Sequence, residues 1–185
     1  YLVIYETLYI FVYDMKSMPL NRSQLKEKIK QGLIQDYVDL GRQLQPAGFD
    51  VTVDKIKRFE SKGSLDFSNS ERRISEASDL VPEKRSEEDK YGWWNLDRGA
   101  YKIVMNEKVD IPNDLVAFGY PRSSLLRMGC TIENAVWDPG FTGVGSFLLL
   151  VQNSEGVDIK QNARVNQLVF HDTGGKQGYE GKYTE

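Results

Sequence analysis

The sequence predicts a mainly β protein, a distorted antiparallel β-barrel or jelly roll with one or two short helices. Short runs of β-branched and aromatic residues recur in the second half of the chain, separated by glycine, proline, asparagine and aspartate. Only one segment near the N-terminus has a clear helical period. A length of 185 residues is enough for one domain with a substantial core, and no internal repeat is evident.

Residues 1–17 are expected to form an N-terminal extension outside the main domain. The apolar run Tyr1–Tyr13 is shorter than the roughly 20 residues that span a bilayer, and no basic region precedes it as in a signal peptide. We therefore expect neither membrane attachment nor a targeting role. The alternating bulky residues favour an added strand. The alternative is that translation naturally starts at Met15 or Met18, so that the extension is incidental.

A short amphipathic helix is predicted within residues 19–35. Asn21 can cap this helix, and Gln24 completes an Asn-x-x-Gln capping box. Leu25 and Ile29 repeat four residues apart and predict the face that packs on a sheet.

The following residues favour strands and turns. Residues 48–53 read as a turn that enters a strand, and Ser61-Lys62-Gly63 reads as the turn of a hairpin. Residues 70–90 mix both signs of charge and indicate an exposed excursion with at most one helical turn. Four later strands are predicted at Tyr101–Met105, Leu115–Gly119, Phe147–Gln152 and Val165–Phe170.

Composition excludes several classes of function. A formal net charge of -3 argues against a protein held to nucleic acid by bulk positive charge. The single cysteine, Cys130, cannot form an intramolecular disulfide and is typical of a reducing, cytoplasmic location. With the single histidine, His171, it cannot supply the His/Cys/Cys cluster of zinc-dependent nucleotide deaminases. An anionic small molecule stays open as a ligand if cations gather locally.

Pro121–Arg127 indicates an anion site. The segment reads as a strand that leads into a short helix, capped by Ser123 or Ser124. Two hydroxyl groups next to the guanidinium groups of Arg122 and Arg127 suit a phosphate group. An ordinary helix cap with surface arginines would have the same sequence.

Asp138-Pro139-Gly140 predicts a tight turn at the tip of a hairpin. An aspartate in the first position of such a turn commonly bonds to the turn backbone. Held rigidly, it could also take a proton from a water that attacks a phosphate. Phe141 could stack on a sugar or belong to the core.

The chain contains five motifs in this order: LQPAGFDV (Leu44–Val51), PRSSLLRMG (Pro121–Gly129), AVWDPGFTG (Ala135–Gly143), ARVNQLVF (Ala163–Phe170) and GYEGKY (Gly178–Tyr183). They resemble the motifs of the dUTPase/dCTP deaminase superfamily, closest to its archaeal-type dUTP diphosphatases. The resemblance covers the chain from Asn21 to the C-terminus. It implies a β domain of the dUTPase fold at residues 18–172, and a glycine-rich arm at residues 173–185 that closes over the active site. It also implies a homotrimer with its active sites at subunit interfaces.

One position separates the two reactions of this superfamily. Members that deaminate dCTP carry a glutamate ten residues after the aspartate of the third motif, and here Leu148 stands there. Val136 stands where deaminases tend to have a basic residue. The resemblance therefore favours hydrolysis of dUTP to dUMP and pyrophosphate, which removes dUTP and supplies dUMP for thymidylate synthesis. The alternatives are dCTP deamination, with a carboxylate from elsewhere such as Glu133, and a non-catalytic nucleotide-binding trimer.

The resemblance also assigns roles to residues. Asp138 is the general base for a water that attacks the α-phosphorus of dUTP, and Mg²⁺ bridges the phosphate oxygens. Asp50 contacts this metal through water or holds the local structure. Phe141 packs under the deoxyribose, Tyr179 and Lys182 close over the nucleotide, and Arg122 alternatively holds the subunit interface. No nucleic acid or membrane partner is expected. The implied substrate-binding residues are Arg122, Ser123, Ser124, Arg127, Phe141, Gln167, Tyr179 and Lys182.

Overall fold

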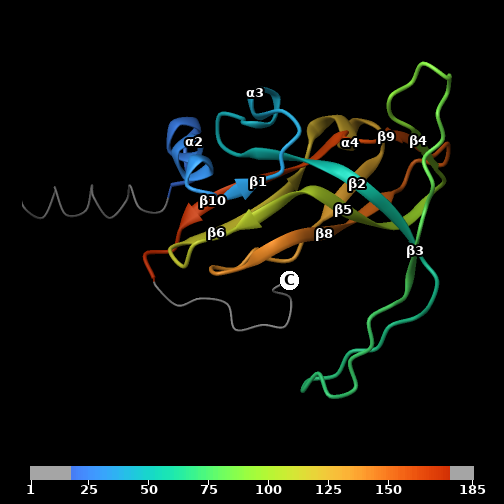
Figure 1. Ribbon diagram of the computed structural model, residues 1–185. Helices are drawn as coiled ribbons and strands as arrows, with labels where there is room; N and C mark the ends of the chain where they lie inside the picture. Colours follow the sequence, from blue (N-terminus) through green and yellow to red (C-terminus); the bar gives the residue numbers. More distant parts are fainter. Residues whose placement is uncertain (1–17, 176–185) are drawn as a thin grey trace, which may run out of the picture.

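A computed structural model describes residues 18–175 as a curved antiparallel β structure with three short helices among the described residues (Figure 1). The main sheet has the strand order β6-β10-β2-β5-β8-β7, with β1 added on β5 and β3 on β2, while β4 and β9 form a separate pair. The predicted fold class, a mainly β barrel-like structure with few helices, is confirmed.

The bounds of the elements are as follows. The strands are β1 (Ile34–Gln35), β2 (Phe49–Phe59), β3 (Ala77–Asp79), β4 (Trp93–Leu96), β5 (Gly99–Asp110), β6 (Leu115–Pro121), β7 (Cys130–Glu133), β8 (Thr142–Val151), β9 (Val157–Lys160) and β10 (Arg164–Asp172). The helices are α2 (Arg22–Lys30), α3 (Leu40–Gln43) and α4 (Ser123–Arg127). No helix within residues 18–175 is both long and apolar enough to cross a membrane.

Two predictions concern residues outside the described range. The structure describes residues 18–175, so the added strand expected in residues 1–17 falls outside it. Most of the glycine-rich C-terminal segment, residues 173–185, falls outside it as well. Both stay predictions.

Helix α2 begins and packs as its sequence predicts. The Asn21 side chain accepts hydrogen bonds from the backbone N–H groups of Ser23 and Gln24, and the Gln24 side chain accepts one from the N–H of Asn21. Leu25 and Ile29 are buried on the face toward the sheet. The helix thereby closes one end of the barrel, beside β1 and β10 (Figure 1).

The core lies between the inward faces of the strands. Buried and less buried residues alternate along β5 and β8, as expected for strands with one face toward solvent. Strand β2 differs, because Phe49–Val53 is buried on both faces between its neighbours and the covering loops. Asp50 and Thr52 are polar members of this segment, so their side chains require partners inside the protein.

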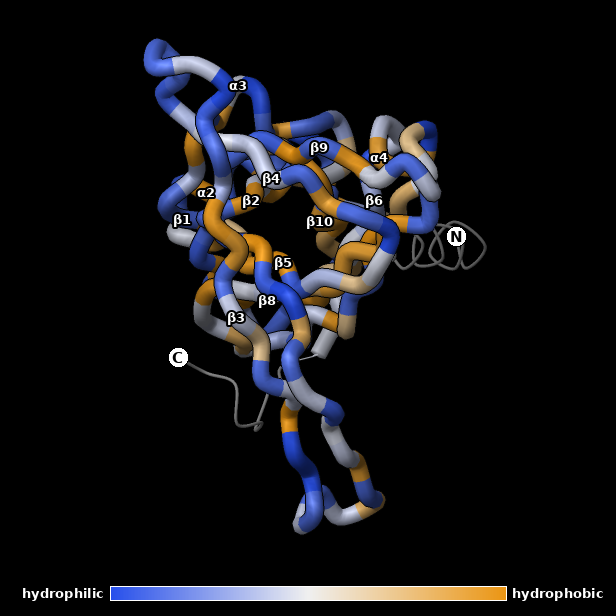
Figure 2. The backbone as a smooth tube through the Cα atoms, turned by 90° about the vertical axis from the view of Figure 1, so that its right-hand side faces the viewer, coloured by the Kyte–Doolittle hydropathy of each residue, from blue (hydrophilic) through white to orange (hydrophobic). Residues whose placement is uncertain are grey.

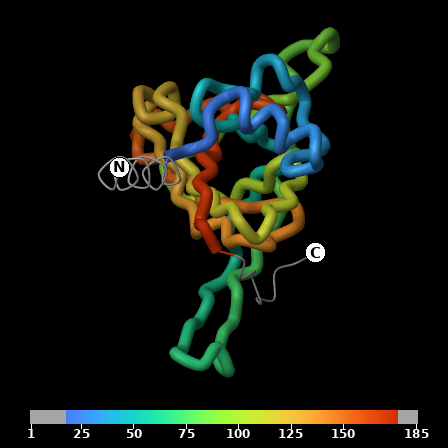
Figure 3. Tube along the Cα trace, turned by 90° about the vertical axis from the view of Figure 1, so that its left-hand side faces the viewer, coloured from blue at the N-terminus to red at the C-terminus, as the bar shows by residue number. Residues whose placement is uncertain are grey.

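The hairpin that follows β2 is larger than predicted. The sequence suggested a turn at Ser61-Lys62-Gly63, and this interpretation is wrong: β2 continues to Phe59 and pairs with β3, while Ser64 pairs with Arg73. Gly63 lies in one strand of the hairpin, where an added Cβ would approach the carbonyl oxygen of Arg73 to 2.8 Å. Residues 60–76 thus form a long ribbon, here called the arm, that projects from the barrel (Figures 2 and 3).

A buried glutamate fills the gap where β2 leaves β5. Strand β2 pairs with β5 from Val53 onward and with β10 over Phe49–Thr52. Glu107 lies at this split with 0% of its surface exposed. Its carboxylate accepts hydrogen bonds from the Thr52 N–H (3.0 Å), the Thr52 hydroxyl (2.6 Å) and the Gln43 amide (2.6 Å). The same Gln43 amide donates to the backbone carbonyl of Asp50 at 2.9 Å, so Glu107 helps to fix β2 at Asp50.

Replacing Glu107 by glutamine should change how stability depends on pH. Burial raises the pKa of Glu107 above its ordinary value of 4.5, although the hydrogen bonds from Thr52 and Gln43 act to lower it. The folded protein then holds this proton more tightly than the unfolded chain does. The contribution of Glu107 to the free energy of unfolding therefore falls as pH rises from about 4.5 through the raised pKa.

Urea unfolding of the wild type and Glu107→Gln at several pH values tests this expectation. The free energy of unfolding of the wild type minus that of the variant should decrease with rising pH. A difference that grows with pH would mean that the hydrogen-bond donors outweigh burial and that the pKa is lowered. Glu133→Gln is a suitable control, because Glu133 is exposed.

Candidate active site

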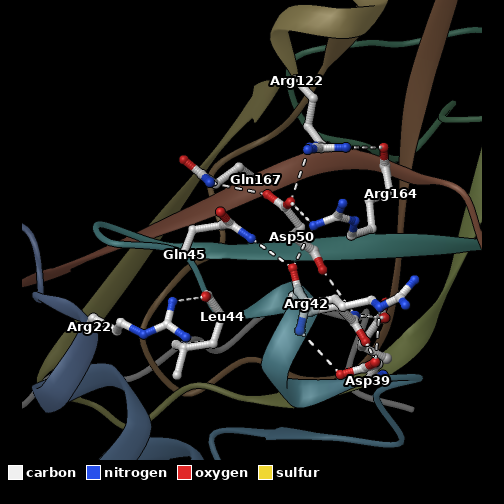
Figure 4. A network of polar contacts seen from close by, with 11 residues as sticks. Arg22, Asp39, Arg42, Leu44, Gln45, Asp50, Arg122, Arg164 and Gln167 are labelled. Carbon is white, nitrogen blue, oxygen red and sulfur yellow. Dashed lines mark hydrogen bonds and ion pairs between the residues drawn. The ribbon is translucent and has the colours of Figure 1, made fainter.

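The central polar group of the site is the carboxylate of Asp50. Only 1% of its side chain is exposed, although it lies on a strand of the barrel wall. Arg122 approaches one carboxylate oxygen at 3.0 Å and Arg164 approaches the same oxygen at 3.3 Å. The Gln167 amide donates to the other oxygen at 3.1 Å. Figure 4 shows the three side chains converging on Asp50 from the segments around α4 and β10.

Backbone pairing explains why these distant residues meet. Gln167 lies directly opposite Asp50 in the β2–β10 ladder and opposite Tyr120 in the β10–β6 ladder. Arg122 follows β6, and its N–H donates to the carbonyl of Val165 at 3.1 Å. Two strand pairings therefore bring residues of the first, second and fourth motifs together at one carboxylate.

Burial and the two arginines act in opposite directions on Asp50. Burial raises the pKa of the Asp50 carboxyl, whereas Arg122, Gln167 and Arg164 lower it, and burial has the larger effect. Both oxygens already face a guanidinium or an amide group. The surroundings therefore fit a structural anion well and a direct metal ligand poorly, so the predicted contact with metal through water stays a prediction.

The segment after Arg122 carries the exposed groups suited to an anion. Ser123, Ser124 and Arg127 are all exposed in α4, and no hydrogen bond or ion pair within residues 18–175 engages their side chains. The prediction that a serine caps this helix is wrong, because Arg122 occupies the N-cap position. Its extended backbone continues the hydrogen bonding of β6 to β10, and Ser123 is already the first helical residue, so the helix begins earlier than predicted.

Asp138 lies in the predicted tight turn. The Phe141 N–H donates to the Asp138 carbonyl at 3.1 Å, and Gly140 has a φ of +82° that favours glycine. Backbone bonds of Gly140 and Phe141 to Ile111 hold the turn, and Trp137 pairs with Ala117 of β6 on its other side. The carboxylate is half-buried, and no partner within residues 18–175 engages it. It is thus a rigidly held carboxylate that is not used for the turn.

Phe141 and its neighbour Trp137 form the base of this hairpin. Their rings meet edge to face with centroids 5.6 Å apart, and Phe141 packs partly against the core. Trp137 covers Gly145 so closely that an added Cβ would lie 1.9 Å from the ring. The two rings pack against each other next to the turn, and the Phe141 side chain is partly accessible to solvent.

Leu148 lies in the middle of β8, between Lys102 of β5 and Glu133 of β7. A proton shuttle on the pyrimidine ring requires a titratable group, which leucine lacks. Glu133 lies directly opposite Leu148 and is exposed. It is therefore the acidic residue that the β7–β8 pairing brings to this position.

The sequence did not reveal a pair of amides that joins two parts of the site. The Asn166 amide, buried next to Gln167, donates to the side-chain oxygen of Asn134 at 2.9 Å. Asn134 begins the segment that leads to Asp138 and packs over Gly119, where an added Cβ would lie 2.4 Å from its side chain. The only sequence signal was a second side-chain amide, Asn166, next to Gln167 in the fourth motif.

The structure places the predicted residues in two groups. Arg122 and Gln167 gather around Asp50, whereas Asp138 and Phe141 lie in the hairpin. Within residues 18–175 no hydrogen bond or ion pair links Asp138 to the residues of α4. Tyr179 and Lys182 lie outside the described residues, and no three His, Cys, Asp or Glu side chains inside that range group as metal ligands.

Known proteins resemble this chain over most of its length. The sequence model of the dCTP deaminase-like family matches residues 19–173. A probable deoxyuridine 5'-triphosphate nucleotidohydrolase of Methanococcoides burtonii is 40% identical over 168 residues, which cover 89% of this chain and 95% of that protein. The deoxyuridine 5'-triphosphate nucleotidohydrolase of Methanocaldococcus jannaschii is 39% identical over 142 residues, covering 76% of this chain and 86% of that protein.

A solved structure supports the same fold. The crystal structure of 2'-deoxycytidine 5'-triphosphate deaminase from Agrobacterium tumefaciens superposes with a TM-score of 0.62 at 19% identity. The match covers 85% of this chain and 48% of the deaminase chain, so this chain spans about half of that structure. The family match, the sequence identity of the archaeal relatives and the ordered motifs lead to one conclusion. The chain belongs to the dCTP deaminase-like family, within the dUTPase/dCTP deaminase superfamily.

Proposed function

We propose that this protein is a dUTP diphosphatase that hydrolyses dUTP to dUMP and pyrophosphate. Two residues carry the proposal. Asp138 in the hairpin has a carboxylate that no residue within 18–175 engages, whereas Leu148 stands at the position where deaminases carry a catalytic glutamate and has no carboxylate. The names of the archaeal relatives support the same reaction. A cytoplasmic site of action agrees with the single, buried cysteine, Cys130.

Asp138 acts as the general base in this proposal. The turn fixes its position, and the half-buried carboxylate accepts a proton from the water that attacks the α-phosphorus. The bond from the α-phosphorus to the bridging oxygen breaks, and pyrophosphate leaves. Phe141 packs under the deoxyribose, and Tyr179 and Lys182 cover the nucleotide.

The phosphates bind at α4, where Ser123, Ser124 and Arg127 are exposed. Arg122 instead holds the loop to Asp50 through its ion pair, and Gln167 supports the same carboxylate. Trp137 pairs with Ala117 near the start of β6, whereas α4 begins after the end of β6, so the complete site combines the hairpin of one chain with the α4 segment of another in a homotrimer. Mg²⁺ accompanies the triphosphate and offsets its charge.

Product analysis in ¹⁸O-labelled water tests the reaction. Incubation with dUTP and Mg²⁺ should give dUMP that carries one ¹⁸O and pyrophosphate that carries none, because water attacks the α-phosphorus. Label in the pyrophosphate would place the attack at the β-phosphorus and contradict the proposed role of Asp138. Binding of dUTP without any turnover would support the non-catalytic trimer instead.

Deamination of dCTP is the second candidate, because Glu133 lies directly opposite Leu148. Ammonia release from dCTP, lost in Glu133→Gln, would favour it. The absence of ammonia would exclude deamination, and the ¹⁸O experiment would then decide between hydrolysis and binding without turnover.

Arg127→Ala should raise the KM for dUTP about tenfold or more and leave kcat within a few fold. A hydrogen bond to a charged group contributes about 1.5–3 kcal/mol. A contact with the phosphates that is equally strong in the bound substrate and in the transition state affects KM and leaves kcat unchanged. Steady-state kinetics measure the effect. Arg98→Ala is the matched control, because Arg98 is also exposed but lies between β4 and β5. An unchanged KM in Arg127→Ala would remove Arg127 from the phosphate site.

A further inference from the structure

Two side-chain amides, those of Asn134 and Asn166, meet inside the barrel. Asn166 lies on β10 with 0% of its surface exposed, opposite Pro121 of β6 and Val51 of β2. Its amide nitrogen donates to the side-chain oxygen of Asn134 at 2.9 Å. Asn134 directly follows the end of β7 and begins the segment that leads to Asp138. The hydrogen bond therefore ties the hairpin of Asp138 to β10.

The backbone gives the start of this segment no other hydrogen bond. Within residues 18–175 the backbone of Asn134–Val136 makes none, and the hairpin is first held by the two backbone bonds between Trp137 and Ala117. The Asn134 side chain lies directly on β6, where an added Cβ at Gly119 would approach its Oδ1 atom to 2.4 Å. This contact and the bond to β10 fix the direction in which the chain enters the hairpin.

The same stretch of β10 holds the other group of site residues. The Val165 carbonyl, one residue before Asn166, accepts from the N–H of Arg122 at 3.1 Å. The Gln167 amide, one residue after it, donates to the Asp50 carboxylate. Three consecutive residues thus fix the start of α4, the entry to the hairpin and the group around Asp50. β10 therefore sets the spacing between the two groups of site residues that one chain supplies.

The amide pair contributes little stability of its own. The Nδ2 atom of Asn134 and the Oδ1 atom of Asn166 are shielded from solvent, and neither has a hydrogen-bond partner within residues 18–175. A buried polar atom without a partner destabilises the folded protein, whereas two apolar groups of the same shape in place of a hydrogen-bonded pair are nearly neutral or stabilising. The single hydrogen bond instead gives the contact a direction, because its strength depends on the alignment of donor and acceptor.

We propose that the hydrogen bond between Asn134 and Asn166 positions the Asp138 carboxylate for catalysis. Both asparagines act through the hairpin and contact neither the phosphates nor the attacking water. The inference rests on the hydrolysis of dUTP under the proposed function. In the homotrimer each hairpin meets phosphates held by α4 of a neighbouring chain. The spacing set by β10 therefore decides how far Asp138 lies from the α-phosphorus.

The double variant Asn134→Leu/Asn166→Leu separates positioning from stability. Leucine branches at Cγ as asparagine does, so the double variant should unfold at the wild-type urea concentration or a higher one. Its kcat for dUTP should fall about tenfold to a hundredfold in single-turnover kinetics, because a displacement of about 1 Å can cost about a hundredfold in rate. Affinity for dUTP should stay within a few fold, since the phosphates bind at α4. A wild-type kcat in the double variant would overturn the proposal.

Asn106→Leu is the matched control for the single variant Asn134→Leu. Asn106 donates to the side chain of Asn162 at 3.0 Å, which is a second hydrogen bond between two asparagine amides and joins β5 to the turn before β10. Both single variants should lose stability, because each leaves an amide without its partner. Only Asn134→Leu should also lose kcat. An equal loss of kcat in the two variants would assign the effect to stability and refute the positioning role.

Hydrogen exchange of the full chain without nucleotide tests the anchor independently of activity. In the double variant the backbone amides of residues 135–141 should exchange faster than in the wild type, while those of β2 and β5 should exchange at the wild-type rate. Unchanged exchange in residues 135–141 would show that the hydrogen bond does not hold the hairpin, and would contradict the inference alone. A wild type without dUTP turnover would instead refute the proposed function, and the positioning role with it.

Discussion

Asp138→Asn should lower kcat for dUTP hydrolysis by about 10²–10⁴-fold, the range that a positioned general base contributes. Asparagine has nearly the same shape but cannot accept a proton from the attacking water. The turn should persist, since its hydrogen bonds involve the backbone of Asp138 and Phe141 and none engages the carboxylate. Affinity for dUTP should therefore stay within a few fold of the wild type.

Single-turnover kinetics with calorimetric binding of dUTP measure the two effects separately. Glu155→Gln is the matched control, since Glu155 is an exposed acid in the turn after β8 and should change neither quantity. A near-normal kcat in Asp138→Asn would show that another group activates the water. Loss of binding together with loss of rate would indicate a structural role for the carboxylate.

Asp50→Ala should lower the free energy of unfolding by about 2–4 kcal/mol. Removing one partner of a buried ion pair leaves the remaining charges without compensation, which typically costs about 3–5 kcal/mol. Arg122 and Arg164 keep about a third of their side chains exposed, so water relieves part of the cost. The Gln167 amide also loses its acceptor.

Urea unfolding monitored by tryptophan fluorescence gives this difference. Asp79→Ala is the control, because the Lys57–Asp79 ion pair of 2.8 Å lies at the surface and its loss should change stability little. Equal effects of the two substitutions would mean that the Asp50 cluster contributes no more than a surface pair. A large loss of stability would assign Asp50 chiefly to holding the second and fourth motifs together.

Local signals in the sequence predicted the parts of the structure that depend on near neighbours. The capping box of Asn21 and Gln24 and the turn at Asp138 are set by contacts within four residues, so residue type alone identifies them. The same holds for the alternating strand at Val165–Phe170, which lies within β10.

Contacts between distant segments could not be predicted in this way. Arg122 meets Asp50 across 72 positions of sequence only because β10 pairs with both β2 and β6. Glu107 falls on the inward-facing side of β5 by strand alternation, but its charge argues against a core position. The groups that donate hydrogen bonds to it come from distant segments and meet it where β2 and β5 separate, so the sequence alone does not identify them. The sequence placed the turn of the arm at Ser61-Lys62-Gly63, because these residue types are common in tight turns. In the structure the turn lies further along the chain, where the Asp66 carboxylate accepts hydrogen bonds from backbone N–H groups as far as Glu71.

A competition assay tests the central claim most directly. The purified protein is incubated with Mg²⁺ and equal concentrations of dUTP and dCTP, and nucleotides and ammonia are followed together. Hydrolysis by Asp138 with Leu148 in the deaminase position predicts conversion of dUTP to dUMP and pyrophosphate, while dCTP persists and no ammonia forms. Release of ammonia with loss of dCTP would contradict this account.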